Sequence, residues 1–424
     1  MTKQGDRTVA LILLMTIYVF NFMDRQILGV LIEPIKHELH LSDSQLGLLT
    51  GFMFALFYTS FGIPLAWLAD RTRRTWVIAG SCALWSGFSA ACGLATGFGS
   101  LAAARIGVAV GEAGGVPPSY SLIADMFPPQ RRARAIAIYS LGVPIGIGIG
   151  TATGGWIASL YGWRVAFFAV SAPGILLSLL LLALVREPAR GQVNAAAGAH
   201  GAVSLPRAVA LFVSSPALML VSLAGGLGAF ACYGLMAWIS AYLIRVLGMN
   251  LGQIGLWLSL TLAGGLGAGI WASGVLTDRL AATDRRMFAL IPAAALALGA
   301  PLLFAATILN DWRLALPVFG VTLALSVFYL APTVAIVQQL VPPAQRSAAS
   351  AMMLFCLNLI GLGCGPLFLG MVSDAALPAH GGQSLRVAFQ ALVPMFVLAA
   401  LANLVAARVL ARTPSVPEVA ISGL

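Results

Sequence analysis

Four charged residues lie inside segments that otherwise consist of apolar residues. Asp24 and Arg25 stand in the first of these segments, and Arg105 and Glu112 stand in the fourth. A charge at the centre of a bilayer costs roughly 2.5–3.5 kcal/mol, so the four residues must compensate one another or carry out a function. Buried carboxylates can carry protons, and guanidinium groups can hold an anion.

Helical geometry constrains how these four side chains point. Asp24 and Arg25 are adjacent, so their side chains leave a helix about 100° apart. Arg105 and Glu112 are separated by about two helical turns and share one face of their helix. The four charges sum to zero. Two hypotheses account for them: a proton-coupling site, or a structural ion network that only fixes helix packing.

The composition is typical of a membrane protein. Of the 424 residues, 60% are hydrophobic and only 9% are charged, whereas soluble proteins carry about 25% charged residues. Apolar stretches of about 20–28 residues recur, each long enough to cross about 30 Å of hydrocarbon. We expect an all-α polytopic fold with twelve transmembrane helices in two six-helix bundles. The predicted spans are 9–33, 44–70, 75–97, 100–124, 132–158, 165–185, 217–245, 252–278, 287–309, 314–340, 346–373 and 386–411.

The connections between these spans predict orientation and domain organisation. Most of the 24 lysines and arginines fall in alternate connections. By the positive-inside rule these connections and both termini are cytoplasmic, in a cell inner membrane. The longest polar interruption is rich in Ala, Gly and Pro and is typical of a linker. We therefore expect an N-terminal bundle at 1–185, a cytoplasmic linker at 186–209 and a C-terminal bundle at 210–424.

The two halves of the chain carry matching landmarks. Asp70-Arg71 ends the second predicted helix, and Asp278-Arg279 ends the eighth. A Pro-Pro pair followed by arginine precedes the fifth helix at 128–132 and the eleventh at 342–346. Matching landmarks at equivalent places indicate a duplicated six-helix unit. Parallel repeats of this kind build transporters whose site lies between the halves.

The loop after the second helix resembles a motif of the major facilitator superfamily. The turn Asp70-Arg71-Thr72-Arg73-Arg74 and its copy at Asp278-Arg279 carry the resemblance, although Ala66 and Arg73 stand where the motif usually has glycine. The resemblance implies a cytoplasmic gate in which Asp70 meets the N-terminal end of helix eleven and Asp278 meets that of helix five. The implied gate residues are Asp70, Arg71, Arg74, Arg132, Asp278, Arg279 and Arg346.

Within the superfamily, four segments resemble the spinster family: Asn21–Gln26, Arg105–Ala113, Pro117–Tyr120 and Leu122–Asp125. This resemblance implies proton-coupled transport of an amphipathic lipid, such as a lysophospholipid or a sphingosine phosphate-like molecule, by alternating access. Helices one and four line the central cavity in this fold. Asp24 and Glu112 are then the expected proton-coupling residues, and Asn21, Arg25 and Arg105 belong to the substrate or charge network.

The second half has almost no intramembrane charge, which suits an amphiphile with a charged head and an apolar tail. Four further residues are candidates to line the cavity: Tyr58, Tyr233, Tyr329 and Asn358. The fifth helix carries glycine at every fourth residue between Gly142 and Gly154, a spacing that lets helix backbones approach closely.

Two alternative functions stay open. One is a proton symporter of small organic anions such as uronates, in which Arg25 and Arg105 clamp a carboxylate. The other is a non-transporting sensor or lipid-binding scaffold. The chain carries no nucleophile, metal-ligand or nucleotide motif and no basic patch interleaved with aromatics. We therefore expect no enzymatic activity, no cofactor, no metal and no nucleic-acid partner, and a monomer.

Overall fold

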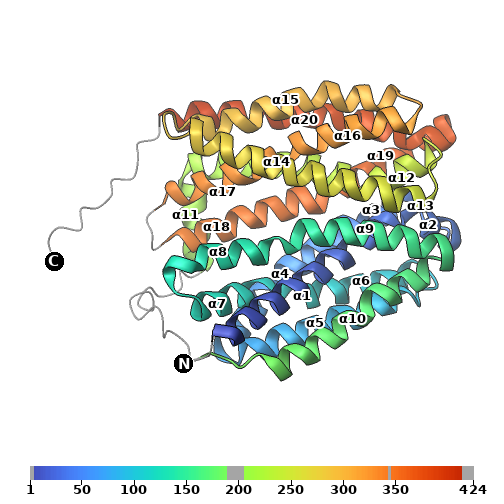
Figure 1. Cartoon of the computed structure of the whole chain (residues 1–424). Helices are drawn as coiled ribbons and strands as arrows, with labels where there is room; N and C mark the ends of the chain where they lie inside the picture. Colours follow the sequence, from blue (N-terminus) through green and yellow to red (C-terminus); the bar gives the residue numbers. More distant parts are fainter. Residues whose placement is uncertain (1–3, 189–204, 342–344, 413–424) are drawn as a thin grey trace, which may run out of the picture. The chain divides into compact units, whose positions relative to one another are not determined.

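The computed structural model describes residues 4–188, 205–341 and 345–412, and every regular element in these ranges is helical (Figure 1). The prediction of an all-α polytopic fold is confirmed. Part of the predicted linker, residues 189–204, lies outside the described ranges, and α11 (Leu205–Ser214) begins within the remainder. The division of the chain at this linker stays a prediction.

The described residues divide into two compact units. Unit 1 takes in the described parts of Met1–Ala199 together with Met236–Gly264 and Pro366–Ala388. Unit 2 takes in the described parts of His200–Leu235, Gly265–Gly365 and Phe389–Leu424. The long helices α12, α14 and α20 contribute residues to both units.

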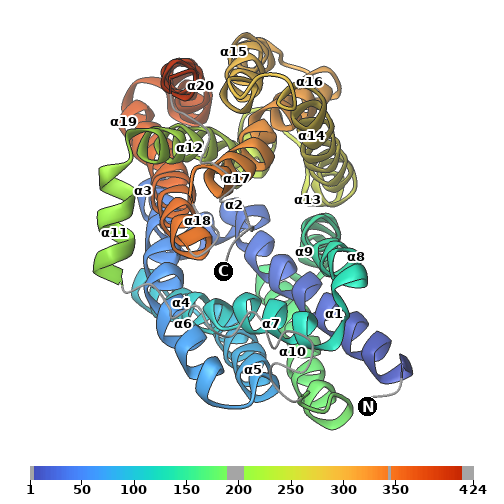
Figure 2. The same cartoon turned by 90° about the vertical axis from the view of Figure 1, so that its left-hand side faces the viewer.

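The helices of the first half all belong to unit 1. They are α1 (Gln4–Val30), α2 (Ile32–Leu39), α3 (Asp43–Gly47), the π-helix η1 (Leu48–Phe52), α4 (Met53–Arg71), α5 (Arg74–Cys92), α6 (Phe98–Ala113), α7 (Val116–Met126), α8 (Pro129–Ser140), α9 (Gly142–Tyr161) and α10 (Trp163–Leu184). Figure 2 shows α1 beside α9, and α5 beside α6.

The second half repeats this pattern of long helices with short irregular turns. Its elements after α11 are α12 (Pro216–Arg245), α13 (Leu251–Gln253), η2 (Ile254–Leu258), α14 (Ser259–Leu280), α15 (Met287–Ile308), α16 (Trp312–Ser326), η3 (Val327–Tyr329), α17 (Leu330–Gln339), α18 (Arg346–Cys356), η5 (Leu357–Cys364), α19 (Gly365–His380), η6 (Gly381–Gln383) and α20 (Ser384–Leu410).

Ten helical stretches among the described residues are long and apolar enough to span a membrane. Two differences explain why ten stretches, and not twelve, account for the twelve predicted spans. The stretch Ala348–Leu410 has 63 residues, about twice the length of one crossing, and contains the eleventh and twelfth predicted spans. The fourth predicted span, 100–124, is broken between α6 and α7 at Gly114 and Gly115, so neither piece is long enough to count alone.

The duplicated unit is visible in local structure. Before the second predicted span, Ser42 and Gln45 form a capping box, in which the Ser42 hydroxyl accepts from the Gln45 backbone N–H at 3.1 Å. Before the eighth, Asn250 and Gln253 form the same arrangement at 2.8 Å. A π-helix follows each box, η1 in one half and η2 in the other. Each box satisfies two backbone donors that a helix start leaves without intrahelical partners.

Close helix packing positions the charged residues of α1. A Cβ added at Gly150 of α9 would lie 2.7 Å from Met23 Cα, and one added at Gly154 would lie 3.2 Å from Ile27. Cβ atoms do not approach a backbone as closely as 2.7 Å, so only glycine at position 150 allows this contact between α1 and α9, whereas at Gly154 the Ile27 side chain would have to shift. The predicted close packing of the glycine row is confirmed, and it fixes the helix turn that bears Asp24 and Arg25.

Candidate functional site

The four charges predicted inside the membrane meet in unit 1, and we call them the buried charge cluster. Asp24 and Arg25 lie on α1, and Arg105 and Glu112 lie on α6. Three of the four are nearly inaccessible, with Asp24 and Arg105 each 2% exposed and Glu112 1% exposed, while Arg25 is half-buried. Burial this deep requires that each charge face an opposite one.

Arg25 pairs tightly with Glu112. Its Nη2 and Nε both donate to Glu112 Oε2, at 2.5 Å and 3.1 Å. Hydrogen bonds between ionised groups are about twice as strong as neutral ones, so this contact ties α1 to α6. The other oxygen, Glu112 Oε1, is buried and has no hydrogen-bond partner within the described part of the chain.

Asp24 is held in a different way. The hydroxyl of Ser89 on α5 donates to Asp24 Oδ1, while Arg105 Nη1 lies 3.9 Å from Asp24 Oδ2. That separation keeps the charge attraction but exceeds hydrogen-bond length. Asp24 Oδ2 and Arg105 Nε and Nη1 have no hydrogen-bond partner among the described residues. The cluster therefore consists of one tight pair and one loose pair.

Aromatic rings enclose both guanidinium groups. The Arg25 guanidinium carbon lies 5.0, 4.8 and 4.9 Å from the ring centroids of Phe22, Phe54 and Tyr58. The Arg105 guanidinium carbon lies 5.1 Å from the same Phe54 ring. Each contact is within the range of a cation–π interaction. Tyr58 thus lies against the cluster, and its role in lining a substrate cavity stays a prediction.

The packing of α6 on α5 keeps this geometry in place. A Cβ at Gly111 would lie 2.6 Å from the Trp85 backbone nitrogen, so α6 and α5 touch backbone to backbone one residue before Glu112. Ser89 lies one turn beyond Trp85 on α5 and reaches Asp24. Asn21 is 4% exposed and lines a cavity of about 10 Å³ beside Trp85. Such a volume holds about one water molecule.

The other predicted cavity residues belong to unit 2. Tyr329 lies in η3 and is 3% exposed, and its ring packs on the backbone of Gly228 in α12. Tyr233 is half-buried on α12, and Asn358 is half-buried in η5. Their role in substrate contact stays a prediction.

One of the predicted gate residues anchors a buried ion network. Arg74 is 2% exposed; it donates from Nη1 to Asp125 at 2.5 Å and from Nε to Glu187 at 2.8 Å. Burial raises the pKa of Glu187, but hydrogen bonds from the Thr75 backbone and from Arg74 outweigh it and hold that pKa below its usual value. This network joins the first turn of α5 to the end of α7 and to the chain after α10.

The remaining gate residues lie at helix ends. Arg71 stacks 3.8 Å from the Trp67 ring centroid, and Arg132 donates to the Ala124 carbonyl at 2.9 Å. The other four are exposed, at the ends of α4 and α14 and at the start of α18: Asp70, Asp278, Arg279 and Arg346. Their predicted pairing with helix N-termini stays a prediction.

Comparison with known proteins decides the family. The model of the Major Facilitator Superfamily matches residues 14–362, which is most of the chain. The chain belongs to the Major Facilitator Superfamily. An MFS-type efflux pump of Mycolicibacterium smegmatis is 35% identical to it over 379 residues, covering 88% of this chain and 86% of the pump. The hexuronate transporter of Bacillus subtilis is 25% identical over 378 residues, covering 87% of this chain and 88% of the transporter.

A solved structure shows that this chain is similar to one family within the superfamily. The crystal structure of a bacterial homolog to the human lysosomal transporter spinster, inward-facing and unoccupied, superposes with a TM-score of 0.90 at 29% identity. The match covers 98% of this chain and 100% of that one. The predicted resemblance to the spinster family is confirmed. This superfamily member is a multi-pass membrane transporter related to spinster, and its family consists of transporters rather than enzymes.

The superfamily member also contains an ion cluster that the sequence analysis missed, and we call it the Asp43 cluster. It lies in unit 1, where the end of α12 meets α2, α3 and α19. Arg245 donates to Asp43 from Nη1 at 2.6 Å and from Nη2 at 2.9 Å, and to Glu33 from Nη2 at 2.6 Å. Lys36 and Ser373 reach the same Asp43 carboxylate, each at 2.6 Å.

A second carboxylate completes the Asp43 cluster. Asp374 of α19 accepts from the backbone N–H groups of Asp43 and Ser44 at 2.9 and 2.7 Å, which satisfies the start of α3. The sequence signal was present: Glu33, Lys36 and Asp43 flank the first predicted connection on the same side of the membrane as Arg245. Their convergence depends on how the helices pack, and no spacing rule supplies that.

Proposed function

We propose that this chain is a proton-coupled transporter that moves an amphipathic anionic lipid, such as a lysophospholipid or a sphingosine phosphate-like molecule, by alternating access. One observation carries the proposal, namely the unequal pairing within the buried charge cluster. A proton on Glu112 would neutralise the carboxylate that accepts two hydrogen bonds from Arg25, and both bonds would lose their charge-assisted strength. A proton on Asp24 Oδ2 would weaken no hydrogen bond from an arginine, because Arg105 is 3.9 Å away. Asp24 is therefore the proposed proton carrier, and Glu112 is the second.

Protonation of Asp24 changes what Arg105 can bind. Once Asp24 is neutral, Arg105 keeps a full positive charge in a buried site and gains most from an anionic head group. Arg25 remains engaged by Glu112 until a stronger anion competes for it. Proton binding shifts the balance between inward and outward states only if the two states differ in proton affinity, which exchange of these partners would provide.

Similarity and chemistry together favour a lipid. The aromatic rings around Arg25 and Arg105 offer an apolar wall directly beside the charges, which suits a head group joined to a hydrocarbon chain. The match to the spinster-related structure supports the family resemblance from which this substrate class follows. The hexuronate transporter supports the alternative, in which Arg25 and Arg105 clamp the carboxylate of a small organic anion.

The test is proton flux in proteoliposomes, followed with an internal pH dye while lysophospholipid or glucuronate is added. We expect lysophospholipid to trigger flux in the wild type and Asp24→Asn to abolish it. Glu38→Gln, an exposed carboxylate outside the cluster, is the control and should transport normally. Wild-type flux in Asp24→Asn would refute the assignment of the proton carrier. Flux with glucuronate alone would establish the alternative substrate.

The proposal includes the placement of the chain in the membrane. The bias of basic residues supports cytoplasmic termini in the inner membrane, and the gate residues, led by Asp70 and Asp278, would close the cytoplasmic side. Residues 186–209 would then join two bundles of a monomer. A fluorescent protein fused after Leu424 should fluoresce and an alkaline phosphatase fused there should be inactive. The reverse result would invert the orientation and move the proposed gate to the other side.

A further inference from the structure

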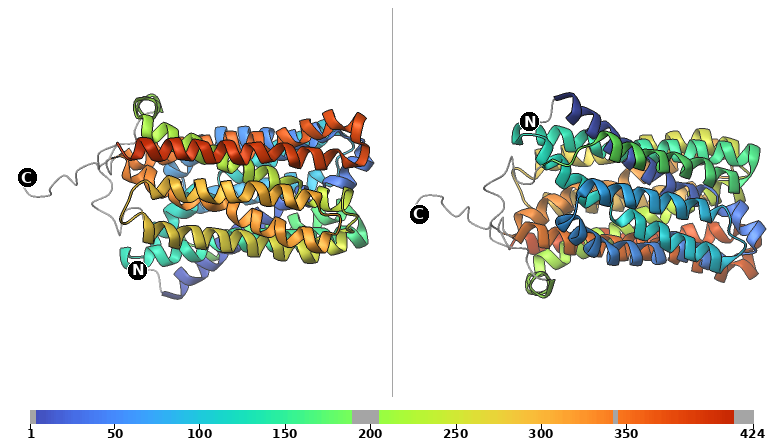
Figure 3. Two further views of the ribbon diagram at one scale, coloured as in Figure 1. Left: turned by 90° about the horizontal axis from the view of Figure 1, so that it is seen from above. Right: turned by 90° about the horizontal axis from the view of Figure 1, so that it is seen from below.

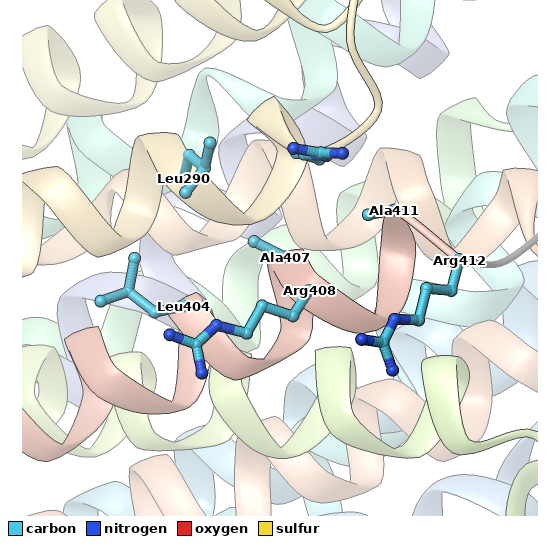
Figure 4. A pocket seen from close by; sticks show the side chains of 7 residues that line it. Leu290, Leu404, Ala407, Arg408, Ala411 and Arg412 are labelled. Carbon is cyan, nitrogen blue, oxygen red and sulfur yellow. The ribbon is translucent and has the colours of Figure 1, made fainter.

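A cavity of about 380 Å³ lies in unit 2, at the end of the helix pair formed by α15 and α20. We call it the arginine pocket. Its lining combines three arginines with apolar residues: Arg286, Leu290, Leu404, Ala407, Arg408, Ala411 and Arg412. Figure 4 shows Arg408 in the last turn of α20, Arg412 just beyond the end of that helix, and Leu290 on α15. The pocket has the size of a small-molecule site and is separate from the buried charge cluster.

The pocket lies beyond the contacts that pack α15 against α20. Gly299 of α15 packs on the Phe396 ring of α20, and nearer the opposite end Gln390 donates to the Thr307 hydroxyl at 3.4 Å. Figure 3 shows the two helices running side by side. Leu290 and Leu404 lie toward the other end of the two helices and line the cavity.

Helix ends account for only part of the charge around the pocket. Arg408 lies in the last turn of α20 and Arg412 follows two residues after the helix ends at Leu410, so two like charges line the same cavity and repel each other. The C-terminal end of a helix attracts cations, and this partly accounts for the pair. It does not account for Arg286, which occupies the N-cap position of α15, where the helix dipole disfavours a cation.

Asp284, the acidic residue closest to Arg286 in the sequence, forms no ion pair with the three arginines within the described residues. Asp284 accepts from the backbone N–H of Arg286 at 2.9 Å, which engages its carboxylate with the start of α15. Within the part of the chain that the structure describes, no ion pair joins a carboxylate to the guanidinium groups of Arg286, Arg408 or Arg412. Three guanidinium groups around one cavity suit a phosphate, which accepts several charge-assisted hydrogen bonds at once.

The apolar side of the pocket indicates where the phosphate comes from. On the face of α20 that bears Leu404, exposed side chains continue along the helix through Leu401 and Val397, which are 42%, 53% and 43% exposed in that order. A free phosphate ion would gain nothing from this apolar stripe. A phospholipid would place its acyl chains along the stripe and its head group among the arginines.

We propose that the arginine pocket binds the phosphodiester head group of an anionic phospholipid from the leaflet in which α20 ends. The lipid is a bound partner and not the transported substrate. It neutralises the repulsion between Arg408 and Arg412 and bridges α15 and α20 at this end of the helix pair.

The test uses the full-length protein, purified in detergent and titrated with phosphatidylglycerol or phosphatidylcholine, with lipid retention read by native mass spectrometry. We expect phosphatidylglycerol to be retained in preference to phosphatidylcholine. The double variant Arg408→Ala/Arg412→Ala should bind it at least about 10-fold more weakly. The matched double variant Arg131→Ala/Arg134→Ala removes two exposed arginines of α8 and should bind it like the wild type.

Two further measurements test the third arginine and the contribution of the acyl chains. Arg286→Ala should weaken phosphatidylglycerol binding as well, because it removes the third cation from a different helix. Inorganic phosphate at equal concentration should not displace the lipid. Equal loss in both double variants, or displacement by inorganic phosphate, would overturn the proposal. Asp24→Asn should leave this binding unchanged, so the outcome is independent of the proposed transport mechanism.

Discussion

The Asp43 cluster permits a prediction whose size follows from its geometry. Arg245→Ala removes two donors from Asp43 and two from Glu33, at 2.6, 2.9, 2.6 and 3.1 Å. The Asp43 side chain is 0% exposed and that of Arg245 is 12% exposed. Breaking a buried ion pair from one side costs about 3–5 kcal/mol, because the remaining charge stays buried. Asp43 keeps Lys36 and Ser373, so we expect a loss near the lower end, about 3 kcal/mol.

Two further variants separate charge from geometry. Arg245→Lys keeps the charge but loses the fork that spans two carboxylates, so we expect about half of the loss, about 1.5 kcal/mol. Asp43→Asn combined with Arg245→Ala should cost less than the sum of the two single variants, with a coupling energy of about 2 kcal/mol. The free energy of unfolding is measured by titration with a denaturing detergent, followed by circular dichroism.

The control for this experiment is Arg313→Ala, an exposed arginine at the start of α16. It should change the free energy of unfolding by less than about 0.5 kcal/mol. If Arg245→Ala is no more destabilising than this control, the Asp43 cluster does not hold the ends of α12 and α19 to α3. The reasoning about buried ion pairs would then be wrong for this site.

Two other predictions concern packing and pH. Gly150→Ala should lower the free energy of unfolding by about 1–3 kcal/mol, because the added methyl group forces α9 away from Met23. Gly80→Ala is the control and should leave the free energy of unfolding unchanged, because a Cβ at Gly80 would meet no atom within 4 Å. Equal unfolding midpoints for the two variants would contradict this prediction. The pKa of Glu187 is lowered from its ordinary 4.5, so its stabilising effect is present above that value and disappears as pH falls through the lower folded-state pKa. The stability difference between wild type and Glu187→Gln should therefore be constant above about pH 4.5 and shrink as the pH falls below it, and a difference that stays constant below that pH would refute this origin.

Hydropathy predicted the fold because lipid imposes one requirement on every spanning segment. Each must be apolar, about 20 residues long and internally hydrogen-bonded. The described helices lie close to the predicted spans for this reason. The break after α6 departed from the expected continuous helix. Its cause was legible in the sequence, since Gly114 and Gly115 are followed by Pro117 and Pro118, which favour a new helix start.

The site was predictable in membership but not in pairing. The cost of burying charge identified Asp24, Arg25, Arg105 and Glu112 as one group. Helical periodicity could not show that Arg25 pairs with Glu112 and that Arg105 lies nearest to Asp24, because the pairing depends on the rotation of α1 relative to α6. The sequence analysis missed Ser89 because a serine hydroxyl in a membrane helix usually donates its hydrogen bond to a backbone carbonyl of the same helix. Only the packing of the helices shows that the Ser89 hydroxyl reaches Asp24.

The charge balance of the buried cluster links the proton to the substrate. The four residues sum to zero, so a proton on Asp24 alone leaves a net positive charge in a buried site. An anion alone leaves a net negative charge, whereas proton and anion together restore neutrality. Opposite charges about 4 Å apart attract by about 4 kcal/mol at an effective dielectric of about 20. Each ligand must therefore strengthen the other by the same factor. In the proposed mechanism an anionic substrate thus travels with the proton. The binding of a substrate without net charge would not be strengthened by protonation of Asp24. A cationic substrate would compete with the proton, and the two would be transported in opposite directions.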